Sequence, residues 1–361
     1  MPPGFRPLRI LFTHFVDGDN YNAQSLNIRE IARRLDPGRF VCTFFFLRNP
    51  DPRLVPLPHA RLLRIPARLG SLVMVKEALR GHDLLFSPGL DSRFCQLYFQ
   101  IPKVFRKPTR TIYWIEGGAG KCEEEWVRDV RRRFDRYASQ MEYFVGITEA
   151  VARASRERYG ILAREIIPVG VDTQVFSPVR RPLERKISVL FVGHLIERKK
   201  PQLILEAARS FPQAFFRLVG RTRDNFLGIL RAQAAANRLG NVEFFEPMPQ
   251  RALAELMHES DILLHPSQTE GMPKVVLEAS ATGMPAIIFN TYGAPVVMDG
   301  VTGYQVSTTE EMLDRLGRLI ESPDRRHRLG EAAAEHAKQF EWEIVARRWE
   351  DILTRVAHTS S

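Results

Sequence analysis

The sequence predicts an α/β protein made of two doubly wound parallel sheets, one in each of two domains. Short apolar runs alternate with amphipathic segments along the chain, which is the pattern of strand–helix units in a parallel sheet. The alternation lapses once, between Pro168 and Pro182, in a segment with three prolines and no helical period. A chain of 361 residues is also long for one hydrophobic core. We therefore expect domains at 1–170 and 187–340, joined by a linker at 171–186.

Each half contains its own series of elements. In the first half, strands are expected at residues 8–15, 40–47, 82–88, 110–115 and 143–148. The segment after the first strand predicts a helix, because four apolar residues recur near one of its faces: Leu26, Ile28, Ile31 and Leu35. A later helix is expected to begin after Thr148, as its N-cap, and to end at Gly160.

In the second half, strands are expected at residues 187–195, 214–220, 241–245, 261–266 and 285–289, with helices between them and a helical tail from Thr308 to Ala357. Because both halves repeat one architecture, we expect ligand to bind in a cleft between them, at the carboxyl ends of the strands.

Composition is that of an ordinary globular protein. Hydrophobic residues make up 44% and charged residues 26% of the chain, and no apolar run approaches the roughly 18–20 residues of a membrane span. The apolar run in the basic N-terminus is too short for a signal peptide. Cys42, Cys95 and Cys122 have neither disulfide arithmetic nor metal-ligand spacing, which indicates a reducing cytoplasm.

Positive charge is concentrated in the first half. Residues 1–178 contain 28 Lys and Arg against 19 Asp and Glu, whereas residues 179–361 contain 24 against 23. This asymmetry indicates an acidic partner or simply a solvated basic surface. In residues 61–80, basic residues interleave with leucine and valine, which suits a helix lying on anionic lipid, although Pro66 and Gly70 interrupt it and a buried helix is the alternative. We expect reversible attachment to the inner face of the cytoplasmic membrane, and no nucleic-acid binding, because no recognition motif is present.

Two glutamates stand eight positions apart around an expected helix start. In HPSQTEGMPKVVLEASATGMPAIIF (265–289) a strand ends, a turn follows, and Pro273 suits the first position of a helix that reaches about Thr282. A helix start attracts phosphate, which Glu270 and Glu278 would repel. Carboxylates bind hydroxyl groups well, so the pattern predicts an anion flanked by two polyols, as in a nucleoside diphosphate sugar. The alternative is that Glu278 pairs with a basic neighbour and Glu270 caps the helix.

A basic loop follows the strand in VLFVGHLIERKKP (189–201). It carries Gly193, His194, Arg198, Lys199 and Lys200. Cations at the carboxyl end of a strand suit a diphosphate, although basic loops are common. Neither GxGxxG nor GxxxxGK(S/T) is present, so the sequence supports neither a dinucleotide fingerprint nor a P-loop.

Several segments together resemble the retaining GT-B glycosyltransferases of the large family four group, which use nucleotide-sugar donors. EGMPKVVLEA resembles the paired-glutamate motif of this family, GHLIERKKP its glycine, arginine and lysine loop, and IPVGVDTQVF its interdomain linker. The resemblance covers most of the chain and is strongest from 140 to 305. It implies a GT-B fold, in which two Rossmann-like domains face each other across a cleft. A final helix at 341–361, with Trp342 and Trp349, would cross back onto the first domain.

The resemblance also implies roles for individual residues. Glu278 would bind the ribose hydroxyls, Glu270 a hydroxyl of the donor sugar, and Lys199 the departing diphosphate. Backbone N–H groups would approach the sugar and phosphates at Gly271, Met272, Lys274 and Val275.

The basic loop would contribute Gly193, His194 and Arg198 to donor binding. The base would lie near Met248, and Gly18 would let an N-terminal loop approach the phosphates without a Cβ.

The sequence departs from the family pattern in places. His194 stands where an arginine usually helps to bind the diphosphate, so that contribution depends on pH or passes to a basic neighbour. Val169 replaces an asparagine of the linker motif, and Val296 replaces a glutamate. Glu116 stands about where relatives often have a histidine near the reacting sugar. It is a candidate acceptor-side base or sugar ligand, or else a structural carboxylate at a strand end.

The function predicted from these observations is transfer of a sugar from a nucleotide-diphosphate donor to a glycan or lipid-linked acceptor, with retention of configuration, in cell-surface polysaccharide biosynthesis. Glu270, Lys199 and Glu116 are the candidate catalytic residues. No cofactor or metal is expected, because lysine and the helix start would neutralise the diphosphate. Two alternatives stay open: a non-catalytic nucleotide-sugar-binding scaffold, and a nucleotide-sugar epimerase or hydrolase on the same fold.

Overall fold

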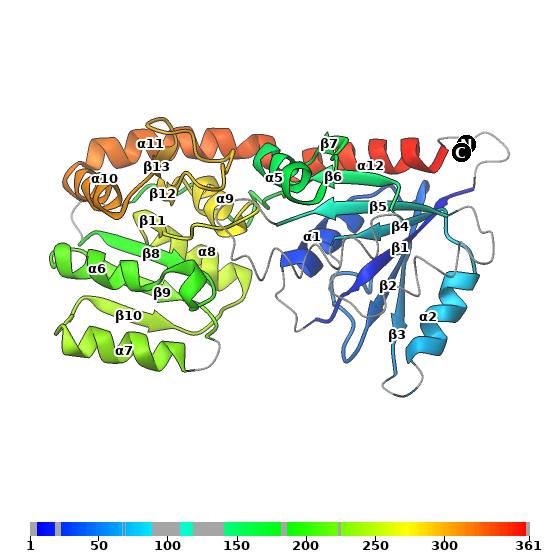
Figure 1. Cartoon of the computed structure of the whole chain (residues 1–361), viewed down its shortest axis with the longest axis horizontal. Coiled ribbons are helices and arrows are strands. Elements are labelled where there is room, and N and C mark those ends of the chain that lie inside the picture. The colour runs from blue at the N-terminus through cyan, green and yellow to red at the C-terminus, as the bar shows by residue number, and fades with distance from the viewer. Residues whose placement is uncertain are drawn as a thin grey trace. The chain divides into compact units, whose positions relative to one another are not determined.

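The chain forms two compact units, each built on a parallel β-sheet (Figure 1). The computed structural model describes residues 6–18, 23–66, 68, 70–88, 109–117, 141–181, 186–222 and 225–358. Of these, the residues up to Gly170 and those from Trp342 onwards form unit 1, and Val171–Glu341 form unit 2.

The sheet of unit 1 has the strand order β3-β2-β1-β4-β5-β6-β7, and every neighbouring pair is parallel. The strands are β1 (Leu8–Phe15), β2 (Phe40–Phe46), β3 (Ala60–Arg64), β4 (Leu84–Ser87), β5 (Arg110–Ile115), β6 (Tyr143–Gly146) and β7 (Glu165–Ile166). Because Ile10 of β1 pairs with Cys42 on one side and Leu84 on the other, the strand order reverses direction at β1. This is the order of a doubly wound sheet.

The helices described in unit 1 are α1 (Ala23–Ala32), α2 (Gly70–Leu79), α5 (Glu149–Tyr159) and α12 (Trp342–His358). The boundaries expected for α5 are confirmed. Thr148 Oγ1 accepts a hydrogen bond from the Val151 N–H at 3.1 Å, and Gly160 closes the helix in the left-handed region at φ 70°.

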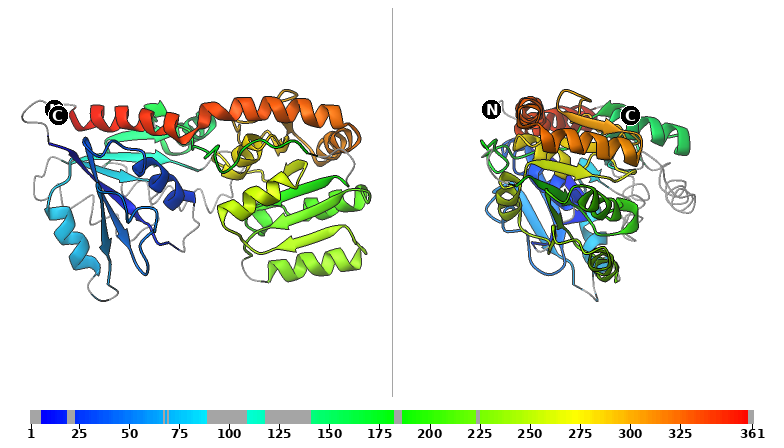
Figure 2. Two further views of the ribbon diagram at one scale, coloured as in Figure 1. Left: turned by 180° about the vertical axis from the view of Figure 1, so that it is seen from behind. Right: turned by 90° about the vertical axis from the view of Figure 1, so that its left-hand side faces the viewer.

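The final helix belongs to unit 1, as the resemblance implied. α12 packs against α1, and Figure 2 shows the two from behind. The ring of Trp349 lies 4.8 Å from that of Phe86 and 5.1 Å from that of Trp114, centroid to centroid. At the start of α12, a Cβ on Gly170 would stand 2.4 Å from the Trp342 ring, so the close approach requires glycine. These buried aromatic contacts hold α12 on the sheet of unit 1.

Unit 2 repeats the architecture, with strand order β10-β9-β8-β11-β12-β13 and parallel pairing throughout. The strands are β8 (Ser188–Val192), β9 (Phe215–Val219), β10 (Val242–Phe245), β11 (Ile262–His265), β12 (Ala286–Phe289) and β13 (Gly303–Val306). The helical segments are η2 (Glu197–Lys199), α6 (Gln202–Ser210), α7 (Phe226–Ala236), α8 (Gln250–His258), α9 (Lys274–Ala281), α10 (Thr309–Glu321), α11 (Pro323–Ala337) and η3 (Lys338–Phe340).

One hydrophobic core joins the unit 2 sheet to α6, α7 and α10. α10 lies beside β12 and β13, and α11 packs against α9 (Figure 1). The second contact is close, because a Cβ on Gly330 would stand 2.2 Å from the Gly283 carbonyl oxygen. This contact with α11 holds α9, which begins at the carboxyl end of β11, in position.

One expectation about unit 1 is wrong. Residues 61–80 do not form a single amphipathic helix, because residues 61–64 belong to the edge strand β3 and α2 starts only at Gly70. Interleaved basic and aliphatic residues fit either element, and Pro66 does not continue a helix. On α2, Leu72 and Lys76 are exposed. None of the helices in the described ranges is long and apolar enough to cross a membrane.

Candidate functional site

The start of α9 presents free backbone N–H groups at the carboxyl end of β11. Pro273 is the N-cap residue, with φ −68° and ψ 112°, and its carbonyl accepts from the Val276 N–H at 3.0 Å. The expected helix is confirmed, beginning one residue later than proposed. The N–H groups of Gly271, Met272 and Val275 have no acceptor in the part of the chain that the structure describes. Such a helix start is suited to an anion.

Glu270 lies beside this helix start and contacts two donors through one oxygen. Lys199 Nζ donates to Glu270 Oε1 in an ion pair, and His265 Nε2 lies 3.3 Å from the same atom. The side chains of Glu270 and Lys199 are only 11% and 12% exposed, and that of His265 is 1% exposed. Within the described residues Glu270 is hydrogen-bonded to Lys199 and His265 and to no N–H group of the first turn of α9. The alternative interpretation, in which Glu270 caps this helix, is therefore wrong.

The protonation of this cluster follows from its contacts. Burial alone would raise the pKa of Glu270, but the hydrogen bond from His265 and the charge of Lys199 outweigh it and hold that pKa well below its ordinary range. Burial lowers the pKa of Lys199, and the Glu270 carboxylate opposes that effect. Burial also lowers the pKa of His265, so the imidazole is neutral at pH 7. Glu270 is thus a fixed negative charge.

Glu278 has a different environment on the second turn of α9. Its side chain is 8% exposed, and Lys274 Nζ lies 4.0 Å from its Oε1. Burial raises the pKa of Glu278, while Lys274 and a hydrogen bond from Gln250 act in the opposite direction. The basic neighbour that the alternative interpretation expected is therefore present. At 4.0 Å it does not neutralise the carboxyl group as closely as Lys199 neutralises Glu270.

The basic loop, residues 193–200, reaches the α9 start from the neighbouring strand β8. Lys199 ends the short η2 turn, and Lys200 adopts the left-handed conformation at φ 51°. Arg198 Nη1 donates to the Thr269 carbonyl at 2.7 Å, next to Glu270. His194 is exposed. The loop thus brings Arg198 and Lys199 to the turn before α9.

Gly193 is held at the beginning of this loop by the neighbouring strand. Its N–H donates to the Val219 carbonyl at 3.0 Å. A Cβ on Gly220, the next residue along, would lie 1.7 Å from the Gly193 carbonyl oxygen. The loop can therefore take this path only because residue 220 is a glycine. The sequence alone did not indicate this role of Gly220.

Met248 is half-buried in the loop between β10 and α8. It stands two residues before Gln250, whose side chain is bonded to Glu278. The segment of Met248, which we expect near the base, thus lies next to Glu278, which we expect near the ribose.

Gly18 and Glu116 belong to unit 1. The Gly18 N–H donates to the Asn49 carbonyl at 3.0 Å, and a Cβ there would lie 3.2 Å from Pro52. Glu116, just after β5, accepts a hydrogen bond from Asn27 Nδ2 at 3.0 Å. Both residues therefore have a structural explanation within unit 1. The departures from the family pattern at Val169 and Val296 are buried apolar positions, 1% and 0% exposed.

Sequence reasoning missed His265 and Gln250. His265 is the only polar residue of the strand ILLH, and it precedes Glu270 by five residues. A polar residue at the carboxyl end of an apolar strand was the available signal. Gln250 carried no signal, because its contact with Glu278 joins segments that are distant in sequence.

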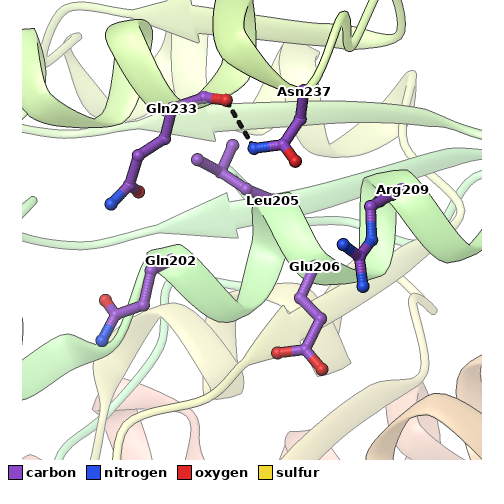
Figure 3. Close-up of a pocket in the computed structure, with 6 residues that line it drawn as sticks. All are labelled: Gln202, Leu205, Glu206, Arg209, Gln233 and Asn237. Carbon is purple, nitrogen blue, oxygen red and sulfur yellow. Dashed lines mark hydrogen bonds between the residues drawn. The ribbon is translucent and has the colours of Figure 1, made fainter.

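A hollow on the surface of unit 2 lies elsewhere, between α6 and α7. It is lined by Gln202, Leu205, Glu206, Arg209, Gln233 and Asn237 (Figure 3). None of the candidate site residues lines it. Within the described ranges, no group of three or more His, Cys, Asp or Glu side chains is placed to hold a metal ion.

The segment that contains the start of α9 also matches a known family. Residues 173–336 match the family model of the glycosyl transferases group 1. This glycosyl transferases group 1 segment covers somewhat less than half of the chain and contains Lys199, Glu270 and Glu278.

Curated proteins that are similar to this chain are also named as glycosyltransferases. The D-inositol 3-phosphate glycosyltransferase of Kribbella flavida is 34% identical over 206 residues, which are 51% of this chain and 49% of that protein. The protein of that name from Mycobacterium tuberculosis is 32% identical over 198 residues, 50% of this chain and 41% of that protein. The chain matches about half or less of the length of these relatives.

Solved structures resemble nearly the whole chain. The crystal structure of HepE from Anabaena in complex with UDP and glucose has a TM-score of 0.80 and 17% identity, and the match covers 96% of this chain and 99% of that one. Sucrose-phosphate synthase from Thermosynechococcus elongatus has a TM-score of 0.81 and 20% identity, with 98% and 100% covered. At these identities the likeness establishes the fold. With its two Rossmann-like parallel sheets, the chain has the GT-B fold, as expected.

Proposed function

We propose that this protein is a glycosyltransferase with a nucleotide-diphosphate sugar as donor. The observation that carries the proposal is the meeting of Lys199 and Glu270 beside the free N–H groups of the α9 start. Lysine and amide groups suit a diphosphate, whereas a fixed carboxylate suits sugar hydroxyls. The match of residues 173–336 to glycosyl transferases group 1, together with the UDP in the HepE structure, makes a UDP-linked sugar the first donor to test.

The parts of the donor are assigned by chemistry. The diphosphate binds the N–H groups at the start of α9 and Lys199, with Arg198 nearby in the basic loop. Glu270 accepts a hydrogen bond from the donor sugar, and Glu278 from the ribose. Met248 lies in the segment that contacts the base. Unit 2 thus binds the donor, and unit 1 supplies the acceptor side, where Glu116 is the candidate residue.

The reaction breaks the bond between the anomeric carbon and the diphosphate oxygen. A bond forms between that carbon and an acceptor hydroxyl oxygen on the same face, with retention, and the hydroxyl proton leaves with the diphosphate. Lys199 and the amides stabilise the charge that develops on the leaving group, and these groups take the place of a metal ion. The family four assignment rests on the paired glutamates and the lysine loop.

The first experiment measures donor binding and then turnover. Thermal unfolding is recorded with UDP-glucose, UDP-N-acetylglucosamine, GDP-mannose and the free diphosphates, because a bound ligand raises the apparent stability. Any donor that binds is then incubated, radiolabelled, with inositol phosphate, glycan and lipid-linked acceptors. Transfer with retained configuration, determined by NMR of the product, supports the proposal.

Other outcomes separate the alternatives. Binding without turnover indicates a scaffold, and conversion of the donor without any acceptor indicates an epimerase or hydrolase. No binding and no transfer with the whole panel contradicts the proposal.

We also propose that unit 1 contacts an anionic membrane surface from the cytoplasmic side, where a lipid-linked acceptor resides. The exposed Leu72 and Lys76 stand one helical turn apart on α2, with the exposed Arg64 and Arg68 before it. Sedimentation with neutral and anionic vesicles tests this. Equal recovery with both kinds of vesicle contradicts the proposal.

A further inference from the structure

His265 ends β11 in the interior of unit 2, and its ring has a fixed orientation. The residue is 1% exposed. Its ring lies nearly parallel to that of Phe191 on the paired strand β8, with 6.2 Å between centroids and 14° between planes. A ring packed in this way cannot turn freely, so the direction of its nitrogens is set by the fold.

The two nitrogens of His265 have different surroundings. Nε2 lies 3.3 Å from Glu270 Oε1, whereas Nδ1 is buried and has no partner among the described residues. An ionised carboxylate can only accept a hydrogen bond, so the hydrogen is on Nε2 and Nδ1 is unprotonated. The other charged groups that act on this histidine are Lys199 and Arg198 of the basic loop.

The carboxylate of Glu270 is consequently used on one side only. Oε1 receives both the Lys199 ammonium and the His265 N–H, while Oε2 has no hydrogen-bond partner in the part of the chain that the structure describes. The buried Tyr292, whose pKa burial and the charge of Glu270 raise, is a further titratable group that acts on this carboxylate. Two donors on one oxygen fix the rotation of the carboxylate and leave the second oxygen available to accept a hydrogen bond.

We propose that His265 is a positioning residue, which holds Glu270 ionised and oriented through its Nε2–H so that Oε2 faces a hydroxyl of the donor sugar. This inference rests on the proposed function, since it names how the same site recognises its sugar. His265 itself contacts neither sugar nor diphosphate. It acts through Glu270, and we expect the Lys199–Glu270 ion pair to persist when His265 is replaced.

Two variants separate this role from simple packing. His265→Phe keeps an aromatic ring against Phe191 but removes the donor, whereas His265→Gln restores an N–H at similar reach. In His265→Phe we expect kcat/KM for transfer from UDP-glucose, or whichever panel donor binds, to fall about tenfold, which corresponds to one hydrogen bond to a charged group. Affinity for the free diphosphate should stay unchanged, and His265→Gln should recover most of the loss.

A second measurement does not depend on activity. The carboxyl carbon of Glu270 is followed by NMR against pH in protein labelled at glutamate and assigned with Glu270→Gln. In the wild type the signal should remain that of an ionised carboxylate at pH values well below 4.5, the ordinary pKa of a glutamate side chain. His265→Phe should raise the pKa of Glu270 by about one unit, because one favourable contact with the ionised form is lost while Lys199 remains. The acid limb of donor binding should move to higher pH with it.

The outcomes are distinct. If the wild type binds no donor, the proposed function fails, and the Glu270 titration alone decides whether His265 holds the carboxylate. If a donor binds but His265→Phe leaves both the titration and kcat/KM unchanged, the inference is overturned. Equal losses in both variants without a titration shift indicate packing only and also overturn it. If His265→Phe does not fold, His265→Gln decides: a wild-type titration and activity support the inference, and loss of both overturns it.

Discussion

Lys199 and Glu270 are 71 residues apart in the sequence and form an ion pair at the start of α9. Neither side chain is more than 12% exposed, so water screens the pair only weakly. The lysine is therefore neutralised by the protein itself when no donor is bound. In the proposed function the diphosphate of the donor competes with Glu270 for Lys199. Lys199 then contacts the diphosphate, and Glu270 contacts the sugar.

This relationship predicts the effect of Glu270→Gln. The substitution removes the carboxylate proposed to bind the sugar and releases Lys199 from its partner. We expect transfer from UDP-glucose to lose about tenfold or more in kcat/KM, while UDP binds as well as before or more tightly. A radiolabelled transfer assay measures the first effect, and calorimetry with UDP and UDP-glucose measures the affinity for each ligand. Glu335→Gln, an exposed change on α11 in the same unit, is the control, and equal loss of UDP and UDP-glucose binding would contradict the assignment.

Glu278→Gln should behave differently. Ribose is common to both ligands, so affinity for UDP and for UDP-glucose should fall together, by about tenfold. The fold should be kept, because burial disfavours the ionised form of this carboxyl group. A loss confined to UDP-glucose would exclude contact with the ribose.

The same variant has a signature in stability. Burial raises the pKa of Glu278 above the ordinary 4.5, so the unfolded chain releases this proton first. The group therefore stabilises the fold fully below pH 4.5, and this contribution is lost as pH rises through the folded pKa. Glu278→Gln should remove that decline, as measured by urea unfolding across the range. An identical pH dependence in the variant would contradict the expectation.

Gly220→Ala tests the path of the basic loop. The new methyl group would stand 1.7 Å from the Gly193 carbonyl oxygen, so the backbone that leads to Lys199 must shift. We expect about 2 kcal/mol of destabilisation and weaker UDP binding. Gly240→Ala is the matched control, because a Cβ there meets nothing within 4 Å and the change should be neutral or slightly stabilising. Similar unfolding curves for both variants would show that Gly220 can be replaced.

Glu30 on α1 predicts acid sensitivity in unit 1. Burial would raise its pKa, but Arg29, Arg33 and Arg34 outweigh this and lower it from 4.5 to about 2. Because the pKa of Glu30 is lower in the folded than in the unfolded chain, its ionised carboxylate stabilises the fold above pH 4.5. This contribution, up to about 3 kcal/mol in the free energy of unfolding, is lost as pH falls towards 2. Urea unfolding followed by tryptophan fluorescence between about pH 6 and pH 3 measures the loss. Glu30→Gln should be less stable at the upper limit and depend less on pH, and an undiminished dependence would assign the loss to other groups.

Arg181 predicts a stabilising role for the linker. Its guanidinium donates to the carbonyls of Met257, Thr282 and Gly283 at 3.2, 3.1 and 3.0 Å, at the ends of α8 and α9. Arg181→Ala should cost about 2 kcal/mol, because these carbonyl groups lose their donor. The exposed neighbour Arg180 provides the control, and Arg180→Ala should unfold like the wild type. Equal midpoints for both variants would remove the role.

Much of the fold followed from local patterns. Thr148 and Gly160 bound α5 as expected, because a hydroxyl N-cap and a left-handed glycine act on their own helix ends. The same holds for Pro273 before α9. Residues 61–80 were misjudged, since an interleaved pattern of basic and aliphatic residues does not distinguish a short edge strand followed by a helix from one continuous helix.

The candidate site divides in the same way. The sequence alone determined the two doubly wound sheets, the helix start after Glu270, and the presence of two carboxylates and a basic loop, because periodicity and turn chemistry act over a few residues. Only the tertiary structure decided that Lys199 and His265 share one oxygen of Glu270, and that Gln250 reaches Glu278. Those contacts join strands and loops that are far apart in the chain. Whether a carboxyl group is a fixed charge or a buried acid depends on the neighbours that folding brings to it.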